Sequence, residues 1–238
     1  MRLVVWNMHH GKIREKLELL RREAKFDMAV LLEIDGSPQD ARDGKWEDFV
    51  SSLDHESPRG IRIWHKPEVT VEQLKTPDLS GVSIARAYRV TPPAGVPFDF
   101  VAYWAVKPVK LPYGDYAEGM RDLLPRCRGL FSGDLLIAGD TNLQAAEVED
   151  LERDLADVPG TCLLRASDGG GVRTVLGAEK QPCDTLLHCG KWWPCDLGIA
   201  SAALAERVKV CAGDWRTWIK PVGVEKTGSD HLPVFFDL

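Results

Sequence analysis

The sequence predicts an α/β (α+β) protein in which sheets pack on each other and helices lie outside, in one domain over residues 1–238. Two observations carry this prediction. Strand-like apolar runs and helical segments mix along the whole chain, and many neighbouring strands are linked without a helix between them. Such sheets bury a face against each other, and helices cover the outer faces. With 238 residues, 44% of them apolar, the chain is large enough for a sizeable core.

Strands are predicted where short apolar runs are bounded by polar or turn-forming residues. These runs are residues 2–6, 28–32, 61–65, 82–88, 98–106, 135–138, 197–200, 208–211 and 232–236. The helical spacing of apolar residues predicts helices at about 12–24, around 46–53 and at 116–130. Pro125 would kink or end the last of these helices. Residues 159–183 are rich in glycine and are predicted to be irregular.

Composition and charge exclude several classes of protein. The formal net charge of −6 argues against a general polyanion-binding protein, because phosphate contacts require clustered Lys and Arg. It leaves open an enzyme that meets phosphate through a bound cation. No apolar stretch approaches the ~20 residues that span a membrane, and we expect no membrane insertion. The N-terminal run lacks the features of a secretory signal, and six cysteines are too few for a disulfide scaffold. We therefore expect a cytoplasmic protein.

A zinc site is a weak alternative use of the cysteines. Cys183, Cys189 and Cys195 are evenly spaced, with His188 beside them. Structural zinc sites usually contain Cys pairs only two to four residues apart. We therefore interpret these residues as ordinary thiols.

Polar side chains recur at the ends of the predicted strands. Asn7 and Glu33 follow two of the runs, Gly139-Asp140-Thr141-Asn142 follows a third, and Ser229-Asp230-His231 precedes the last. Strand ends can bring such residues together on a rigid frame. Each also has an ordinary explanation: a helix cap for Asn7, a solvated loop residue for Glu33, and turn chemistry for residues 139–142.

Together and in this order, these segments resemble the endonuclease/exonuclease/phosphatase superfamily, which has the pancreatic-deoxyribonuclease-like fold. The motifs are Val4-Val5-Trp6-Asn7, Val30-Leu31-Leu32-Glu33, Gly139-Asp140-Thr141-Asn142 and Ser229-Asp230-His231-Leu232-Pro233-Val234. The resemblance is clearest over 1–35, 98–145 and 192–238 and is weak or absent over 36–97 and 146–191. It implies a four-layer sandwich, with two central, mostly antiparallel sheets flanked by helices. The chain resembles a divergent bacterial branch of this superfamily.

The resemblance also implies roles for individual residues. Glu33 would be the main carboxylate ligand of Mg²⁺ or Mn²⁺, with Asn7 and Asp230 close by, and hard oxygen ligands suit these ions. Asp140 would orient or deprotonate the attacking water. The other implied members of the site are Asn142, which positions that water or a phosphate oxygen, and His231, which contacts the phosphate or acts as base and is oriented by Asp196.

One position departs from the superfamily. Its members generally carry a phosphate-binding His or Tyr in the middle strand, whereas residues 100–106 of this chain place Trp104 there. An indole N–H can donate a hydrogen bond but cannot transfer a proton. Tyr103 would point to the opposite face of the strand. For Trp104 the alternative is core packing, which we favour for Trp215 and Trp218.

Further candidates for the site are weaker. Thr174 matches a Thr that braces the site in some members, but it lies in a poorly matched region. Arg173 could contact phosphate, although a surface position is the default. His9 and His10 follow Asn7 closely and could line the cleft, but we interpret them as ordinary loop histidines.

We therefore expect a divalent-metal-dependent phosphoester hydrolase, most simply a phosphodiesterase or nuclease in which the metal assists attack by water. Its partner would be a phosphoester substrate, nucleic acid included. One alternative is a phosphomonoesterase that acts on a small or lipid phosphate. Another is a catalytically impaired binding module of the same fold, which Trp104 favours and the other site residues oppose. The sequence does not indicate the oligomeric state.

Overall fold

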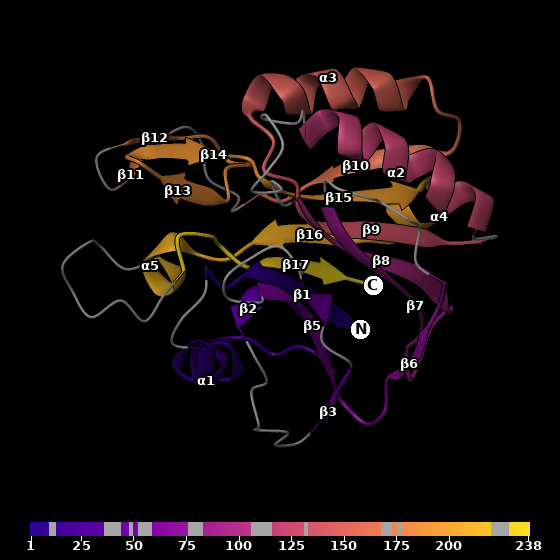
Figure 1. Ribbon diagram of the computed structural model, residues 1–238. Coiled ribbons are helices and arrows are strands. Elements are labelled where there is room, and N and C mark those ends of the chain that lie inside the picture. The colour runs from indigo at the N-terminus through magenta and orange to yellow at the C-terminus, as the bar shows by residue number, and fades with distance from the viewer. Residues whose placement is uncertain are drawn as a thin grey trace.

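The computed structural model describes residues 1–9, 13–35, 44–47, 50–51, 59–75, 83–105, 116–130, 133–167, 173–175, 178–219 and 229–238. Two large β-sheets form the middle of the molecule (Figure 1). The strands of the first sheet are β1 (Arg2–Asn7), β2 (Met28–Asp35), β3 (Lys45–Trp46), β4 (Val50–Ser51), β5 (Arg59–His65), β16 (Lys209–Ala212) and β17 (Val234–Asp237). Their order is β16-β17-β1-β2-β5-β3, with β4 also paired to β5.

The second sheet has the order β10-β15-β9-β8-β7-β6. Its strands are β6 (Thr70–Gln73), β7 (Ser83–Thr91), β8 (Phe98–Ala105), β9 (Leu135–Asp140), β10 (Thr161–Arg165) and β15 (Asp196–Ser201). Within the described residues of the two large sheets, β1 with β2 and β8 with β9 are the parallel pairs. Two small antiparallel ladders complete the β structure: β11 (Arg173–Val175) with β12 (Ala178–Lys180), and β13 (Leu186–His188) with β14 (Lys191–Trp193).

Helices cover the outer faces of both sheets (Figure 1). The first sheet packs against α1 (Ile13–Glu23), and the second packs against α2 (Tyr116–Leu130) and α3 (Ala145–Ala156). Two short helices, α4 (Ala202–Ala205) and α5 (Trp215–Trp218), lie in connections. The predicted four-layer sandwich of mostly antiparallel sheets flanked by helices is therefore confirmed.

Strand alternation explains why the central strands are apolar throughout. In β1, Leu3 and Val5 face the core between the sheets, whereas Val4 and Trp6 face the layer that contains α1. In β8, Trp104 joins the core between the sheets and Tyr103 packs beneath α2 and α3, as the alternation predicted. A strand buried on both faces is a nearly continuous apolar run, and this is the signal that located these strands correctly.

Three local predictions were wrong or incomplete. The helix predicted around 46–53 is replaced by β3 and β4, which pair with β5, and residues 48–49 and 52–53 lie outside the described part. Apolar spacing mimicked a helix there, but pairing with β5 decided the structure. Residues 159–183 contain β10, β11 and β12 rather than only irregular chain. Pro125 lies inside α2, which continues to Leu130.

The helix α3 was not anticipated, although the sequence carries a signal for it. The backbone N–H of Gln144 donates to the Glu147 carboxylate at 2.7 Å, as part of a capping box. This arrangement satisfies backbone donors that the first turn of a helix leaves free. None of the helices in the described part combines the length and apolarity needed to cross a membrane.

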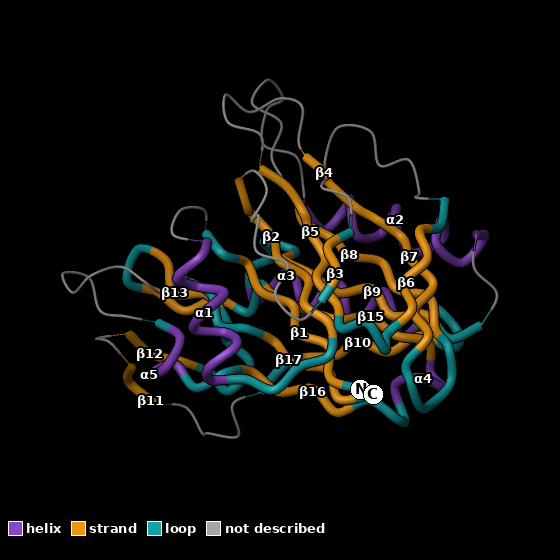
Figure 2. Tube along the Cα trace, turned by 90° about the horizontal axis from the view of Figure 1, so that it is seen from below, coloured by secondary structure: helices purple, strands orange, loops and turns teal. Residues whose placement is uncertain are grey.

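The two chain ends meet at one side of the first sheet (Figure 2). The Met1 amino group donates to the Leu238 carbonyl at 2.6 Å, and β1 runs antiparallel to β17. This pairing brings the predicted site residues of the N-terminal and C-terminal segments into one neighbourhood.

Gly139, which opens the Gly139-Asp140-Thr141-Asn142 motif, has a purely steric role. It is paired with Tyr103 across the parallel strands β8 and β9, and a Cβ added to it would lie 1.6 Å from the Tyr103 carbonyl oxygen. Backbone cannot move that far without breaking the ladder that carries the neighbouring Asp140. The close approach of β8 and β9 therefore requires glycine here.

We predict that Gly139→Ala lowers the free energy of unfolding by at least about 4 kcal/mol, the range of severe core substitutions. Urea denaturation would measure it. The control is Gly160→Ala, where the added methyl group meets open space and only a φ of 72° opposes it. We expect that control to cost about 1–2 kcal/mol. Equal losses in the two variants would contradict the steric explanation.

Candidate active site

Four of the predicted site residues lie where the core between the two sheets becomes polar. Asn7 ends β1, Asp140 ends β9 and Asp196 begins β15, with Asp196 and Asp140 paired across the antiparallel strands β15 and β9. Trp104 is paired with Asp140 from the other side, across β8 and β9. Residues of the same parity in these strands face the core between the sheets. Alternation therefore aims all four side chains at the same end of the sandwich.

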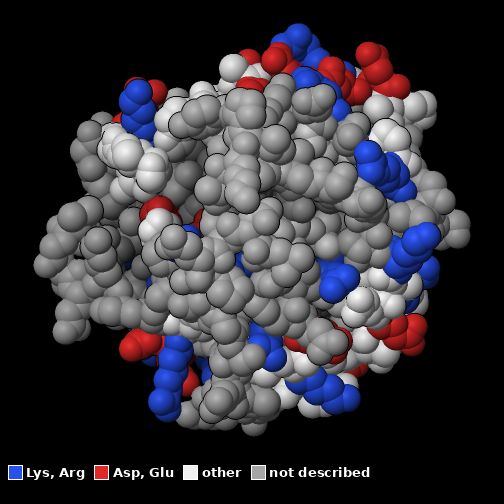
Figure 3. All heavy atoms as spheres, viewed as in Figure 1, with Lys and Arg blue, Asp and Glu red and all other residues white. Residues whose placement is uncertain are grey.

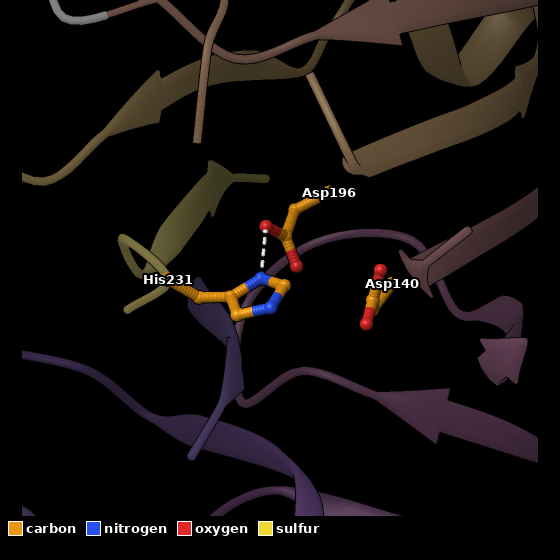
Figure 4. A group of neighbouring side chains, drawn as sticks. All are labelled: Asp140, Asp196 and His231. Atoms are coloured by element: carbon orange, nitrogen blue, oxygen red, sulfur yellow. Dashed lines mark hydrogen bonds and ion pairs between the residues drawn. The ribbon is translucent and has the colours of Figure 1, made fainter. Parts of the chain in front are cut away.

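Two buried hydrogen bonds join the sheets at this end. The Asn7 amide Nδ2 donates to Asp140 Oδ2 at 2.8 Å, which links β1 to β9. His231 Nδ1 lies 2.9 Å from Asp196 Oδ2, which links the segment before β17 to β15 (Figure 4). His231 is 4% exposed, and the two aspartates are 1% exposed. The predicted pairing of Asp196 with His231 is therefore present in the structure.

Burial and mutual charge shift the ionisation of this group. Burial raises the pKa of Asp140 to about 7; the Asp196 charge acts in the same direction, while the His231 charge and the hydrogen bonds from Asn142 and Asn7 oppose it. For His231, burial disfavours the imidazolium. The negative charges of Asp196 and Asp140 and the Asp196 hydrogen bond outweigh burial and raise the pKa of His231 to about 10. The group therefore pairs a cationic imidazole with two acidic side chains.

Asn142 is held by a turn that also fixes Asp140. Its backbone N–H donates to Asp140 Oδ1 at 2.9 Å, and its φ is 52°. Its amide Nδ2 donates to the Ala105 carbonyl at 2.9 Å and to Asp140 Oδ2 at 3.2 Å. Since these contacts use the donors of the amide, the side chain offers its carbonyl oxygen, which is an acceptor.

The predicted metal ligands lie at the neighbouring edge of the first sheet. Asn7 is paired with Leu32, which precedes Glu33 in β2. On the other side, the Ser229 hydroxyl donates to the Asn7 carbonyl at 2.6 Å and directly precedes Asp230. The backbone of Asn7 thus lies between the segments that carry Glu33 and Asp230. Three segments of the chain that carry oxygen donors therefore meet at one edge.

Among the described residues, Asp140, Asp196 and His231 form a further group that could hold a metal ion, with potential ligand atoms within 4.8 Å of one another. Asp196 Oδ1 is buried and has no hydrogen-bond partner in the described part of the chain. The carboxylate oxygens that have partners are Asp196 Oδ2, which contacts His231, and both oxygens of Asp140, which accept from Asn7 and Asn142. The oxygen donors of Asn7, Glu33 and Asp230 suit a hard divalent cation, whereas the His231 imidazole would have to lose its proton before it could bind one.

Backbone strain is concentrated around these residues. Among the described residues, the non-glycine residues with positive φ are His9 (43°), Glu33 (54°), Asn142 (52°) and Cys189 (48°). The first three belong to, or adjoin, the predicted site. Such conformations cost of order 1–3 kcal/mol each and persist where surrounding contacts enforce them.

Two further residues belong to this region, although neither was predicted as a member of the site. Thr185, which is fully buried, accepts a hydrogen bond at its Oγ1 from the Asp196 backbone N–H at 3.0 Å and at its carbonyl from the Leu232 N–H at 2.7 Å. His9 lies in a loop, as predicted, and its Nδ1 is 3.2 Å from Asp230 Oδ1. Thr185 had no sequence signal, whereas the proximity of His9 to Asn7 was a weak one.

The remaining predicted residues are placed as follows. Trp104 is 3% exposed and packs in the core between the sheets beside Asp140. Trp218 is buried beneath the first sheet and Trp215 packs against the same cluster, as favoured from the sequence. Thr174 lies in β11, and its side chain, like that of Arg173, is outside the described part of the structure.

Comparison with known proteins identifies the fold. No model of a known protein family and no curated protein sequence matches the chain. The crystal structure of D. rerio TDP2 complexed with single strand DNA product is similar, with a TM-score of 0.61 and 14% identity, and the match covers 100% of this chain and 99% of that chain. The human nocturnin catalytic domain with bound sulfate has a TM-score of 0.62 and 16% identity, covering 100% and 93%. A mannosyl-6-phosphatase from Bacteroides thetaiotaomicron has a TM-score of 0.60 and 13% identity, covering 100% and 98%.

The chain therefore has the endonuclease/exonuclease/phosphatase fold, as its motifs indicated. At these identities the likeness shows the fold alone. The activity has to be argued from the side chains of this chain.

The Ser229 hydroxyl bonds two backbone groups of the site, and we predict that its removal lowers the free energy of unfolding. The Oγ donates to the Asn7 carbonyl and accepts the His231 N–H at 3.1 Å. Because Ser229→Ala leaves both buried groups without a partner, we expect a loss of about 1–3 kcal/mol in the free energy of unfolding. Urea denaturation would measure it against Thr70→Ala, an exposed change expected within about 0.5 kcal/mol. If Ser229→Ala lowers the free energy of unfolding no more than Thr70→Ala does, the two hydrogen bonds of Ser229 do not stabilise the site.

Proposed function

We propose that this protein is a divalent-metal-dependent phosphoester hydrolase, and more specifically a phosphodiesterase or nuclease. The observation that carries the proposal is the buried Asp196–His231 pair facing Asp140 at the end of the sandwich. A histidine whose Nδ1 is held by a carboxylate presents its other ring nitrogen in a fixed direction. Placed opposite a second carboxylate, it suits a reaction in which water attacks an anionic centre.

The side chains divide the work as follows. Asp140 orients or deprotonates the attacking water, because its carboxylate is fixed by Asn7 and Asn142. Asn142 positions that water through its carbonyl oxygen; its donors are engaged, so binding a phosphate oxygen suits it less. His231 contacts the phosphate, and Asp196 holds its ring in place.

The cation would be held by Glu33, Asn7 and Asp230. The Asn7 Oδ1 that accepts the His9 N–H keeps a second lone pair, and the described contacts of Asp230 are made to Oδ1, so Oδ2 remains for a ligand bond. When bound, Mg²⁺ or Mn²⁺ neutralises charge on the phosphoryl group. We favour this edge because the atoms of the Asp140–Asp196–His231 group are mostly committed to one another.

The substrate is expected to be a phosphodiester. On the face shown in Figure 3, the described Lys and Arg side chains are interspersed with Asp and Glu, and the net charge is −6. This pattern favours short or small substrates over long duplex nucleic acid. TDP2 was crystallised with single strand DNA product, whereas another neighbour is a mannosyl-6-phosphatase. A monoester substrate is therefore the enzymatic alternative. All six cysteines are free, which supports a cytoplasmic location.

Hydrolysis should depend on the metal, on its proposed ligand Glu33, and on His231 of the Asp140–Asp196–His231 group. We predict cleavage of a generic phosphodiester with Mn²⁺ that chelator abolishes and that Glu33→Ala or His231→Ala lowers at least ~100-fold. Bis-(p-nitrophenyl) phosphate, p-nitrophenyl phosphate, and single- and double-stranded DNA should be assayed in parallel. Matched controls are Glu72→Ala and His188→Ala, which change exposed residues.

Equal activity of the wild type and both site variants would sink this mechanism. Faster cleavage of the monoester than of any diester would replace the phosphodiesterase assignment by a phosphomonoesterase. No cleavage of any substrate by the wild type would favour a binding module of the same fold.

Trp104 and Thr174 are the proposed substrate contacts outside this machinery. Trp104 adjoins Asp140, and its indole N–H can donate to a phosphate oxygen. Since hydrogen bonds to charged groups contribute about 1.5–3 kcal/mol, Trp104→Phe should lower kcat/KM by roughly 10-fold or more. The control, Tyr103→Phe, changes the opposite face of β8. If steady-state kinetics give equal kcat/KM for the two variants, Trp104 does not contact the substrate and its role is core packing.

A further inference from the structure

His9 adopts a strained backbone conformation that three separate contacts enforce. Its φ is 43°, a value that is uncommon for a residue with a side chain. Its backbone N–H donates to Asn7 Oδ1 at 2.9 Å, and its carbonyl accepts from Lys16 Nζ at 3.5 Å. Its ring Nδ1 lies 3.2 Å from Asp230 Oδ1. The backbone and the side chain of His9 are therefore both fixed.

Lys16 contributes an unusual anchor for this turn. It lies in α1, is only 3% exposed, and donates from Nζ to the Met8 carbonyl as well as to that of His9. Buried lysines are rare unless their charge is compensated. Here the ammonium holds the two carbonyls that lead out of β1, which keeps His9 in its strained conformation.

The ring of His9 contacts one carboxylate oxygen of Asp230. The Ser229 hydroxyl lies 3.4 Å from Asp230 Oδ1, and His9 Nδ1 approaches the same oxygen. The Ser229 proton goes to the Asn7 carbonyl, so His9 Nδ1 is the donor that restricts rotation of the carboxylate and leaves Oδ2 on the other side. The Asp230 side chain is 22% exposed and that of His9 is 50% exposed, so the pair sits at the mouth of the site.

We propose that His9 is a positioning residue of the metal site, which fixes the Asp230 carboxylate so that Oδ2 is presented to the cation. The inference rests on the proposed function, because it takes Asp230 as a metal ligand. It gives the ring a role at a position where glycine would adopt the same φ without strain. Groups that hydrogen-bond to metal ligands typically contribute 10- to 100-fold in metal affinity.

The test compares His9→Ala, His9→Gly and His9→Asn in the full chain. Binding of Mn²⁺ alone is followed by the loss of the free Mn²⁺ signal in electron paramagnetic resonance. Alanine and glycine both remove the ring, but glycine also relieves the backbone strain. Asparagine tolerates positive φ, and its amide can still donate to Asp230. A thermal melt of each variant reports the backbone effect separately.

If His9 positions Asp230, the alanine and glycine variants both bind Mn²⁺ about 10-fold more weakly, although glycine melts at the higher temperature. The asparagine variant recovers most of the affinity. At saturating Mn²⁺, KM for the phosphodiester stays within about twofold of wild type. Affinity that follows the melting temperature, with glycine close to wild type, would overturn the proposal. So would an unchanged affinity with a raised KM, which would make His9 a substrate contact.

A double-mutant cycle separates this inference from the proposed function. In an Asp230→Ala background, His9→Ala should cause no further loss of Mn²⁺ affinity, because His9 acts through the removed carboxylate. If Asp230→Ala alone binds Mn²⁺ as wild type does, the assignment of Asp230 as a ligand fails, and His9 loses its role with it. If Asp230→Ala binds weakly while His9→Ala binds normally, only the His9 proposal fails.

Discussion

The contact between the two sheets is the constraint on which the rest of the structure depends. Strand alternation sends every second side chain of β1, β8, β9 and β15 into the space between the sheets. Over most of that space the side chains are apolar, but at one end they are Asn7, Asp140 and Asp196. Polar groups buried this deeply must satisfy one another. Apart from Asp196 Oδ1, they do so largely through bonds that cross from one sheet to the other, so the sheet packing and the site are one arrangement.

The same end of the sandwich carries the backbone strain. Glu33 has a positive φ inside β2, at the register shift between Leu31 and Ile34, and Asn142 and His9 have one just after β9 and β1. The backbone around them is held from separate parts of the chain: Lys16 in α1 bonds the His9 carbonyl, Ser229 before β17 bonds the Asn7 carbonyl, and Thr185 before β13 bonds the Asp196 backbone. Strain of this kind persists only where the surrounding structure enforces it. A rigid frame with strained polar turns suits a site whose groups must be held in fixed directions.

The sequence located the buried strands well and the edge structure poorly. Central strands are apolar on both faces, so their signal depends little on context. By contrast, the short strands form because of what they pair with; these are β3, β4 and the ladders of residues 173–193. Their own sequence carries little strand signal, and for this reason a helix was wrongly predicted around 46–53. In the site, the pairing of Asp196 with His231, which the family resemblance implied, is present. Thr185 was missed because nothing in its own segment marks it.

The sequence by itself determined which strands are buried and which polar residues stand at their ends, since both follow from local alternation and from the order of the motifs. Only the tertiary structure decided what those residues touch. It directed an Asn142 amide donor to Ala105, placed Trp104 beside Asp140, and set His9 against Asp230. Each of these contacts joins segments whose relative position is set by sheet pairing between distant parts of the chain. No local pattern encodes such a contact.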